Sequence, residues 1–178
     1  MKEIRELKLP RLLAHVCTCL LLSACSTPQL PEESVPIVSL MSARLSLARD
    51  VAWAKRAGGL PVRDPAREAV VIGRLLRQGT SADLDEELVW RFARAQIEAS
   101  CLEQESWMKR WQQGEPLPAG DPPALEDLRL RLDRMSSLLL AEYAAAWNTP
   151  AAAAKARLKA SVINPRSAAV AASAFPSK

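Results

Sequence analysis

Residues 81–113 have the sequence SADLDEELVWRFARAQIEASCLEQESWMKRWQQ, which carries the longest helical pattern in the chain. Apolar side chains recur along one side of this segment at helical spacing, at Leu88, Phe92, Ile97, Cys101 and Met108. Residues that suit the N-terminal cap of a helix stand at its start: Thr80, Ser81 and Asp83. The pattern predicts one long helix that ends near Gln113.

The segments on either side of this helix show the same periodicity and are separated by glycine and proline. Gly58, Gly59 and Pro61 end one helix, and Asp64 with Pro65 begins the next, because Asp suits the cap and Pro the first helical position. Further helices are predicted over residues 37–56, 65–79 and 124–147, with short helices that begin after Thr149 and Asn164.

The composition of the chain favours helices throughout. Alanine is the commonest residue, with 30 among 178, whereas Gly occurs 6 times and Phe twice. No segment shows the alternation typical of a strand. We therefore predict an all-α fold, a single-domain bundle of about six helices with a long central third helix. The domain is expected to span residues 37–165, and residues 166–178 are expected to be a short helix or a disordered tail.

The N-terminus has the organisation of a targeting segment. Four basic residues in positions 1–11 precede an apolar stretch over 12–24, which is too short to span a membrane as a helix. The stretch ends Leu22-Ser23-Ala24-Cys25, which resembles the lipobox of bacterial lipoproteins. We expect residues 1–24 to be a lipoprotein signal peptide, Cys25 to carry the lipid, and residues 25–36 to form a tether. An ordinary secretory signal that happens to contain cysteine is the alternative.

Export changes the charge and the cysteine content of the mature chain. Four of the 24 basic and two of the 20 acidic residues precede Cys25, which leaves 20 basic and 18 acidic residues and a formal charge of +2. So small an excess gives little reason to expect a nucleic-acid partner. Ser26 after the lipidated cysteine would direct the protein to the periplasmic face of the outer membrane; without lipidation it would be soluble in the periplasm. Cys101 would have no intrachain disulfide partner.

Several kinds of catalytic site are excluded by the residue content. His15 is the single histidine and lies in the segment expected to be removed. A Ser-His-Asp triad, a Cys-His pair and a histidine-containing zinc site therefore cannot form. The chain also lacks the glycine-rich motifs that bind phosphate groups. We expect neither a metal nor a cofactor.

Charged and amide side chains share helix faces with apolar residues at several places. Arg44 and Lys55 are eleven residues apart, close to three full turns, and so lie on the face that also carries Val51. Arg67 and Glu68 stand in the first turn of the second predicted helix. Alone, such cations are commonly solvated, or cover apolar surface with their stems.

The third and fourth predicted helices carry the remaining candidates. Ser100 and Gln104 are neighbours at i and i+4, on the side of Ile97 and Cys101. Arg129 lies in the segment Leu128-Arg129-Leu130-Arg131-Leu132-Asp133, where it would be a solvated side chain if it stood alone.

Together these positions resemble the all-helical chorismate mutase family. The family pattern of an Arg, a Lys eleven residues on and then Asp-x-x-Arg-Glu is matched by Arg44, Lys55, Asp64, Arg67 and Glu68. Its third-helix motif is matched by Gln96-Ile97-Glu98-Ala99-Ser100 through Gln104, and a further arginine motif by residues 129–135. The order of these motifs after a signal segment is similar to that of the secreted subclass.

The resemblance implies a pericyclic Claisen rearrangement of chorismate to prephenate, which requires no nucleophile, metal or proton transfer. It implies that Arg44 and Arg129 bind the substrate carboxylates, and that Lys55 and Gln104 donate to the ether oxygen. The remaining expected roles are carboxylate orientation by Ser100 and Arg67, contact with the ring hydroxyl by Glu68 and the Asp64 backbone, and an apolar wall of Val51, Ile97 and Cys101. The side chain of Asp64 is explained by its position as an N-cap.

Two functional classes and two assemblies remain open. The chain is either an exported, lipid-anchored chorismate mutase or a non-catalytic helical envelope lipoprotein, a binding or structural module that retains the fold. Because the loop 114–123 is long enough to fold the next helix back within the chain, Arg129 is expected to complete its own site. A homodimer in which a partner supplies this arginine is the alternative.

Overall fold

The computed structural model describes residues 34–145 and 165–174, in which every regular element is a helix and no strand occurs. The helices are α1 (Ser34–Ser46), α2 (Ala48–Ala57), α3 (Pro65–Ser81), α4 (Glu86–Gln112), α5 (Leu125–Ala145) and α7 (Pro165–Ala172). The predicted all-α class is confirmed, and the long third helix of the prediction is α4. None of the helices in these ranges combines the length and hydropathy that a membrane span requires.

The single helix predicted over residues 37–56 is two helices in the structure. α1 ends at Ser46 and α2 begins at Ala48, with Leu47 in the turn between them. The Ser46 hydroxyl donates to the carbonyl of Ala43 at 2.8 Å, and a serine that bonds back to the preceding turn commonly bends a helix. The helix predicted after Thr149 lies outside the described residues.

The N-terminal caps of α3 and α4 differ in how well the sequence predicted them. Asp64 caps α3 as expected, because its Oδ1 accepts the backbone N–H of Arg67 at 3.0 Å. The caps predicted for α4 are wrong: Thr80 and Ser81 are still part of α3 and donate to carbonyls one turn back. Asp85 is the cap, accepting from the backbone N–H of Leu88 at 2.8 Å.

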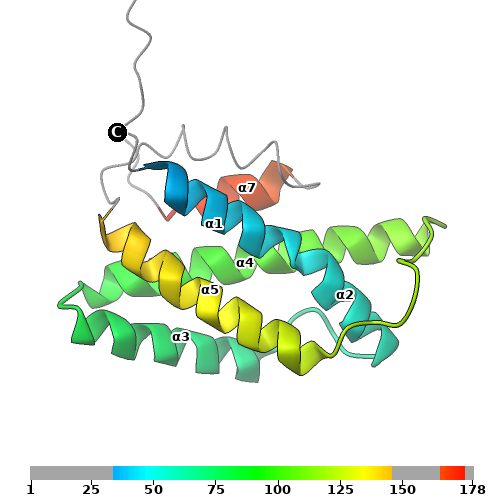
Figure 1. Cartoon of the computed structure of the whole chain (residues 1–178), viewed down its shortest axis with the longest axis horizontal. Coiled ribbons are helices and arrows are strands. Elements are labelled where there is room, and N and C mark those ends of the chain that lie inside the picture. The colour runs from blue at the N-terminus through cyan, green and yellow to red at the C-terminus, as the bar shows by residue number, and fades with distance from the viewer. Residues whose placement is uncertain (1–33, 146–164, 175–178) are drawn as a thin grey trace, which may run out of the picture.

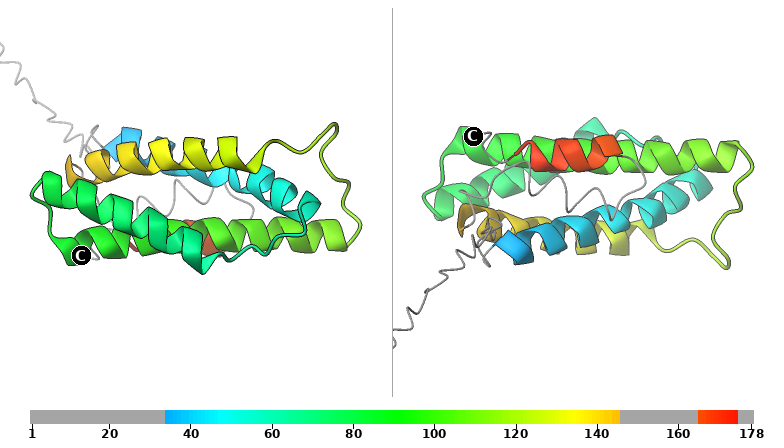
Figure 2. Two further views of the ribbon diagram at one scale, coloured as in Figure 1. Left: turned by 90° about the horizontal axis from the view of Figure 1, so that it is seen from below. Right: turned by 90° about the horizontal axis from the view of Figure 1, so that it is seen from above.

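The helices form an elongated bundle around α4 (Figures 1 and 2). α4 packs against α2, α3 and α7, while α5 packs against α1, α3 and α2. The loop after α4 carries the chain back along the bundle, so that α5 lies beside α1 and α3 of the same chain (Figure 1). This return brings the C-terminal half of the chain next to the first three helices.

One apolar core joins α1, α3, α4, α5 and α7. The rings of Phe92 on α4 and Tyr143 on α5 pack with centroids 4.6 Å apart. Gln96 on α4 donates to the carbonyl of Ala171 at 3.1 Å, and the Tyr143 hydroxyl donates to the carbonyl of Ala174. Small residues let α7 lie close along α4 (Figure 2, right). The described part of the expected C-terminal segment therefore extends the same core.

The contact between α3 and α4 depends on the absence of a side chain at Gly79. A Cβ built on Gly79 would lie 2.6 Å from Cγ2 of Val89, a stiff β-branched residue that is buried in the core. We expect Gly79→Ala to lower the free energy of unfolding by about 1–3 kcal/mol, because an overpacked core must shift. Urea unfolding followed by circular dichroism measures the change.

The matched control is Gly73→Ala, on the same helix. A Cβ there meets only the far end of Arg77, at 3.6 Å. Alanine should stabilise this position by about 0.5–1 kcal/mol, because glycine is the poorer helix former. Equal effects of the two substitutions would contradict the tight α3–α4 contact.

Candidate functional site

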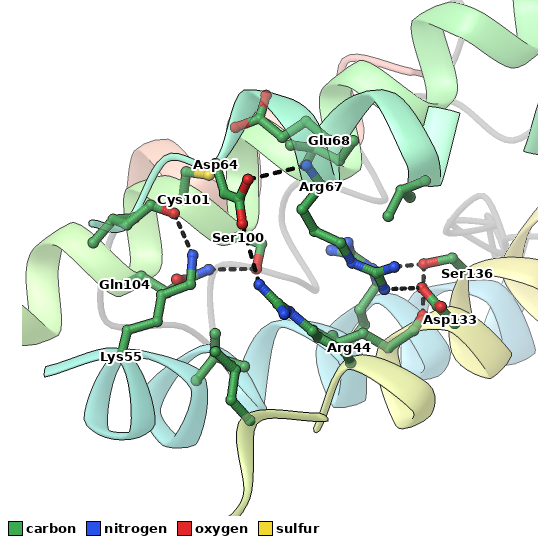
Figure 3. Close-up of a pocket in the computed structure, with 17 residues that line it drawn as sticks. Arg44, Lys55, Asp64, Arg67, Glu68, Ser100, Cys101, Gln104, Asp133 and Ser136 are labelled. Carbon is green, nitrogen blue, oxygen red and sulfur yellow. Dashed lines mark hydrogen bonds and ion pairs between the residues drawn. The ribbon is translucent and has the colours of Figure 1, made fainter. Parts of the chain in front are cut away.

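One pocket between the helices is lined by every catalytic and substrate-binding residue predicted from the sequence (Figure 3). The predicted lipidation site, Cys25, lies outside the described residues. α1 and α2 supply Arg44, Val51 and Lys55, and the first turn of α3 with its cap supplies Asp64, Arg67 and Glu68. The rest come from α4 and α5: Ile97, Ser100, Cys101, Gln104 and Arg129. The structure thus brings these residues together within a single chain, while their chemical roles stay predictions.

Arg44 is a buried cation held from two sides. Its side chain, on α1, is 4% exposed; Nη1 donates to the carbonyl of Gln96 on α4 at 2.7 Å, and Nε donates to Oγ of Ser136 on α5 at 3.2 Å. Burial lowers the pKa of Arg44 to about 10, which still leaves the guanidinium charged at neutral pH. The result is a positive charge of fixed orientation, with N–H groups left over for a ligand.

Lys55 is the second buried cation. It lies on α2, and its Nζ donates to the carbonyl of Val62 in the loop that follows the helix. Burial is the main cause that lowers the pKa of Lys55, and the negative charges of Asp64 and Glu68 partly offset it. The amine is therefore positioned at the pocket wall at some cost in desolvation.

Ser100 and Gln104 form a buried polar pair on α4. Nε2 of Gln104 donates to Oγ of Ser100 at 3.2 Å, and Oε1 of Gln104 has no hydrogen-bond partner in the described part of the chain. Because the O and N of a carboxamide are distinguished only through their hydrogen bonds, the reverse orientation is equally compatible with this pair. In that orientation Ser100 donates to Oε1, and Nε2 becomes the end of the amide without a partner among the described residues.

Ion pairs hold the two remaining arginines. Nη2 of Arg129 on α5 lies 3.1 Å from Oδ2 of Asp64, and Nη2 of Arg67 on α3 lies 2.6 Å from Oδ1 of Asp133. The sequence suggested that the N-cap role explains the side chain of Asp64. The structure shows a second contact as well, because Oδ2 of Asp64 accepts from Nη2 of Arg129. Glu68 contacts Arg94 on α4 at 3.3 Å.

The sequence assigned no role to several residues that line the pocket. These are Val62, Val71, Leu125, Leu132, Asp133 and Ser136. Those on α5 share a face with Arg129, since Leu132, Asp133 and Ser136 follow it at spacings of three, four and seven. That spacing was a usable signal, once Arg129 was accepted as a site residue.

The charges that line the pocket suit a small anion. Four cationic side chains face three carboxylates. Cys101 adds apolar wall, because burial raises the pKa of its thiol and keeps it protonated at neutral pH. Within residues 34–145 and 165–174 no group of three His, Cys, Asp or Glu side chains is arranged to hold a metal ion. The pocket offers fixed positive charge and a neutral amide donor, which are suited to binding and electrostatic stabilisation.

The buried amine of Lys55 should reduce stability at neutral pH. Because its pKa is lowered, the loss of stability is full below the folded-state pKa, shrinks as pH rises above it, and vanishes only above the ordinary value of 10.5. We expect Lys55→Met to raise Tm at pH 7 by about 2–4 °C, equivalent to about 1 kcal/mol, and the difference from wild type to shrink toward pH 10. Calorimetry at several pH values measures this.

Lys109→Met removes an exposed lysine from α4 and serves as the control. Its Tm should follow that of the wild type at every pH. A Lys55→Met protein less stable than the wild type at pH 7 would contradict a net cost of burying the amine.

Comparison of sequences identifies related proteins. Residues 35–105 match the profile of the family described as Chorismate mutase type II. A protein named secreted chorismate mutase from Yersinia pestis is 31% identical over 105 residues, which cover 59% of this chain and 56% of that protein. One of the same name from Mycolicibacterium smegmatis is 27% identical over 113 residues, 64% of this chain and 62% of the relative. The match thus spans little more than half the length of these relatives.

Comparison of structures extends the similarity beyond the matched sequence. The crystal structure of chorismate mutase from Burkholderia thailandensis superposes with a TM-score of 0.69 at 27% identity. The superposition covers 80% of this chain and 96% of that one. The similarity in fold therefore covers more of the chain than residues 35–105.

Proposed function

We propose that the chain is a type II chorismate mutase and catalyses the rearrangement of chorismate to prephenate, because residues 35–105 match that family's profile and the secreted relatives and solved structures carry the same name. One observation carries the proposal: a single pocket of one chain is lined by four cations and an amide, namely Arg44, Lys55, Arg67, Arg129 and Gln104. No nucleophile, metal or general acid is needed for a pericyclic reaction. The pocket chemistry and the reaction therefore agree.

Chorismate has two features that such a pocket suits. It is a dianion with two carboxylates, and it reacts from a compact conformation in which the carbon atoms to be joined lie close together. As the C–O bond breaks, negative charge grows on the ether oxygen. A catalyst must fix the two carboxylates and direct donors at that oxygen.

Arg44 and Arg129 are the proposed ligands of the carboxylates. A guanidinium binds a carboxylate through two parallel hydrogen bonds, which fixes its orientation as well as its position. Arg44 supports this role through its rigid hold between Gln96 and Ser136. Arg129 is paired with Asp64, so the substrate carboxylate joins or displaces an existing ion pair.

Lys55 and Gln104 are the proposed donors to the ether oxygen. Burial of the Lys55 amine away from water strengthens its attraction to negative charge. With its amide in the reverse orientation, Gln104 accepts from Ser100 and offers Nε2 to the oxygen. A neutral amide has no proton that titrates near pH 7, so this donor persists across that range.

The other predicted residues complete the proposed assignment. Arg67 and Ser100 would orient a carboxylate, and Glu68 with the backbone of Asp64 would contact the ring hydroxyl. An apolar wall next to the reacting atoms would be formed by Val51, Ile97 and Cys101. All of them are close to the proposed ligands because they line the same pocket.

The direct test is conversion of chorismate by the purified protein, followed by the loss of its ultraviolet absorbance. Conversion that rises in proportion to protein concentration supports the proposal. A well-folded protein without activity would instead favour a non-catalytic helical module of the envelope that retains the fold.

Lys55→Ala and Gln104→Ala should lower kcat more than they raise KM. Their donors face charge that grows in the transition state, and the loss should be about 3 kcal/mol each, as for an oxyanion donor. Steady-state kinetics separates the two parameters. Lys109→Ala, an exposed change on α4, should leave both near wild type. Unchanged turnover of the Lys55 variant would overturn the mechanism.

Mixing two inactive variants tests whether each chain completes its own site. Arg129→Ala and Lys55→Ala chains are refolded together and assayed. If Arg129 serves its own chain, no hybrid contains a complete site and activity is not recovered, whether or not the protein forms a homodimer. In an exchanged dimer, hybrids would restore about a quarter of wild-type activity. Recovery of that size would refute the intrachain site.

We also propose that the protein is exported and anchored by lipid at Cys25, on the periplasmic face of the outer membrane. The names of the two secreted relatives support export, and the sequence Leu22-Ser23-Ala24-Cys25 supports lipidation. Residues 1–24 would be the signal peptide and 25–36 the tether to the domain. Cys25→Ser should release the protein from the membrane fraction; wild-type protein without lipid by mass spectrometry would contradict the anchor.

A further inference from the structure

Asp133 on α5 contacts two arginines of α3. Its Oδ1 lies 2.6 Å from Nη2 of Arg67 and 3.1 Å from Nη2 of Arg74. The two arginines are seven residues apart, so they stand on one face of α3, two turns from each other. Asp133 lines the pocket, as Arg67 does, and its side chain is only 20% exposed.

A carboxylate at this position is not explained by the binding of an anion. It adds negative charge to a pocket that suits a dianion, and it also faces the buried charge of Arg44. Joining two helices does not by itself require it, because Gln78 of α3 already donates to the carbonyl of Ser137 on α5 at 2.9 Å. The contact with Arg67 suggests another role.

Arg67 depends on Asp133 for its position. Within the described ranges, Asp133 is the one carboxylate that the guanidinium of Arg67 contacts. The side chain of Arg67 is 26% exposed. Without that contact a long, partly exposed side chain is free to sample several rotamers. With it, one hydrogen bond fixes the guanidinium and most of its five N–H groups remain for a ligand.

The next turn of α5 uses the same arrangement. Ser136 accepts from Nε of Arg44, just as Asp133 accepts from Nη2 of Arg67. Arg129 lies one turn before Asp133 on the same face. α5 thus contributes one arginine to the pocket and holds two that belong to other helices.

We propose that Asp133 is a positioning residue that acts through Arg67, holding its guanidinium where it meets a carboxylate of the substrate. The inference rests on the proposed function, and it assigns to Asp133 an effect on substrate binding that a tie between helices would not have. A carboxylate is charged in the ground state and in the transition state alike. Loss of the hold should therefore raise KM more than it lowers kcat.

The test is a double-mutant cycle on kcat/KM with chorismate as substrate. Asp133→Ala should lower kcat/KM by about 10- to 100-fold, as expected for a misplaced binding group. In the Arg67→Ala background the same change should have almost no further effect, because the group through which it acts is gone. Asp133→Asn, which keeps the acceptor oxygen, should recover much of the loss. Asp127→Ala, an exposed carboxylate on the same helix, is the control.

Each alternative has its own result. If Asp133 only ties α3 to α5, its loss should lower the apparent kcat by reducing the folded fraction and should leave KM unchanged. The loss in kcat/KM should then be as large in the Arg67→Ala background as in the wild type. That result would overturn the proposal. Asp133→Leu, which has the same branching and number of side-chain heavy atoms but no acceptor, replaces Asp133→Ala in the cycle if that protein does not fold. No conversion by the wild type would overturn the proposed function, and this inference with it. An active wild type with additive losses would overturn this inference alone.

Discussion

The rest of the pocket depends on the hydrogen bonds that hold the buried guanidinium of Arg44 between α4 and α5. A charge inside a helical bundle is costly unless it is hydrogen-bonded, and here a carbonyl of α4 and a hydroxyl of α5 each accept one N–H of Arg44. Because Gln96 and Ser136 must both reach one planar group on α1, the three helices are fixed relative to one another at this point. Gln96 also bonds α7 through its side chain, so the same residue joins the site to the core.

The other charges of the pocket follow the same principle of fixed orientation. Arg129 is held by Asp64 and Arg67 by Asp133, so each cation has a partner before a ligand arrives. Positioned charges need little reorganisation during a reaction, which is the main source of electrostatic catalysis. The cost is borne in stability, most plainly at Lys55, whose burial disfavours its charged form.

α5 supplies five of the seventeen residues that line the pocket, although it lies beyond the residues that match the family profile. The match covers residues 35–105, and Arg129, Asp133 and Ser136 all follow it. The loop after α4 returns α5 to the first three helices of its own chain (Figure 1). A chain with this order can complete a site without help from a second copy, which is the physical basis for expecting activity from one chain.

The sequence by itself determined the helical class and most helix boundaries, because helical periodicity and Gly and Pro positions are local properties. The candidates that line the pocket came from the resemblance of their spacing to the family pattern, such as the eleven residues between Arg44 and Lys55. It missed the break at Leu47 and the cap at Asp85, where alternative side-chain hydrogen bonds compete over a few residues. Only the tertiary structure revealed the pairing of Asp133 with Arg67. That contact joins residues 66 positions apart, and it exists because two helices pack side by side.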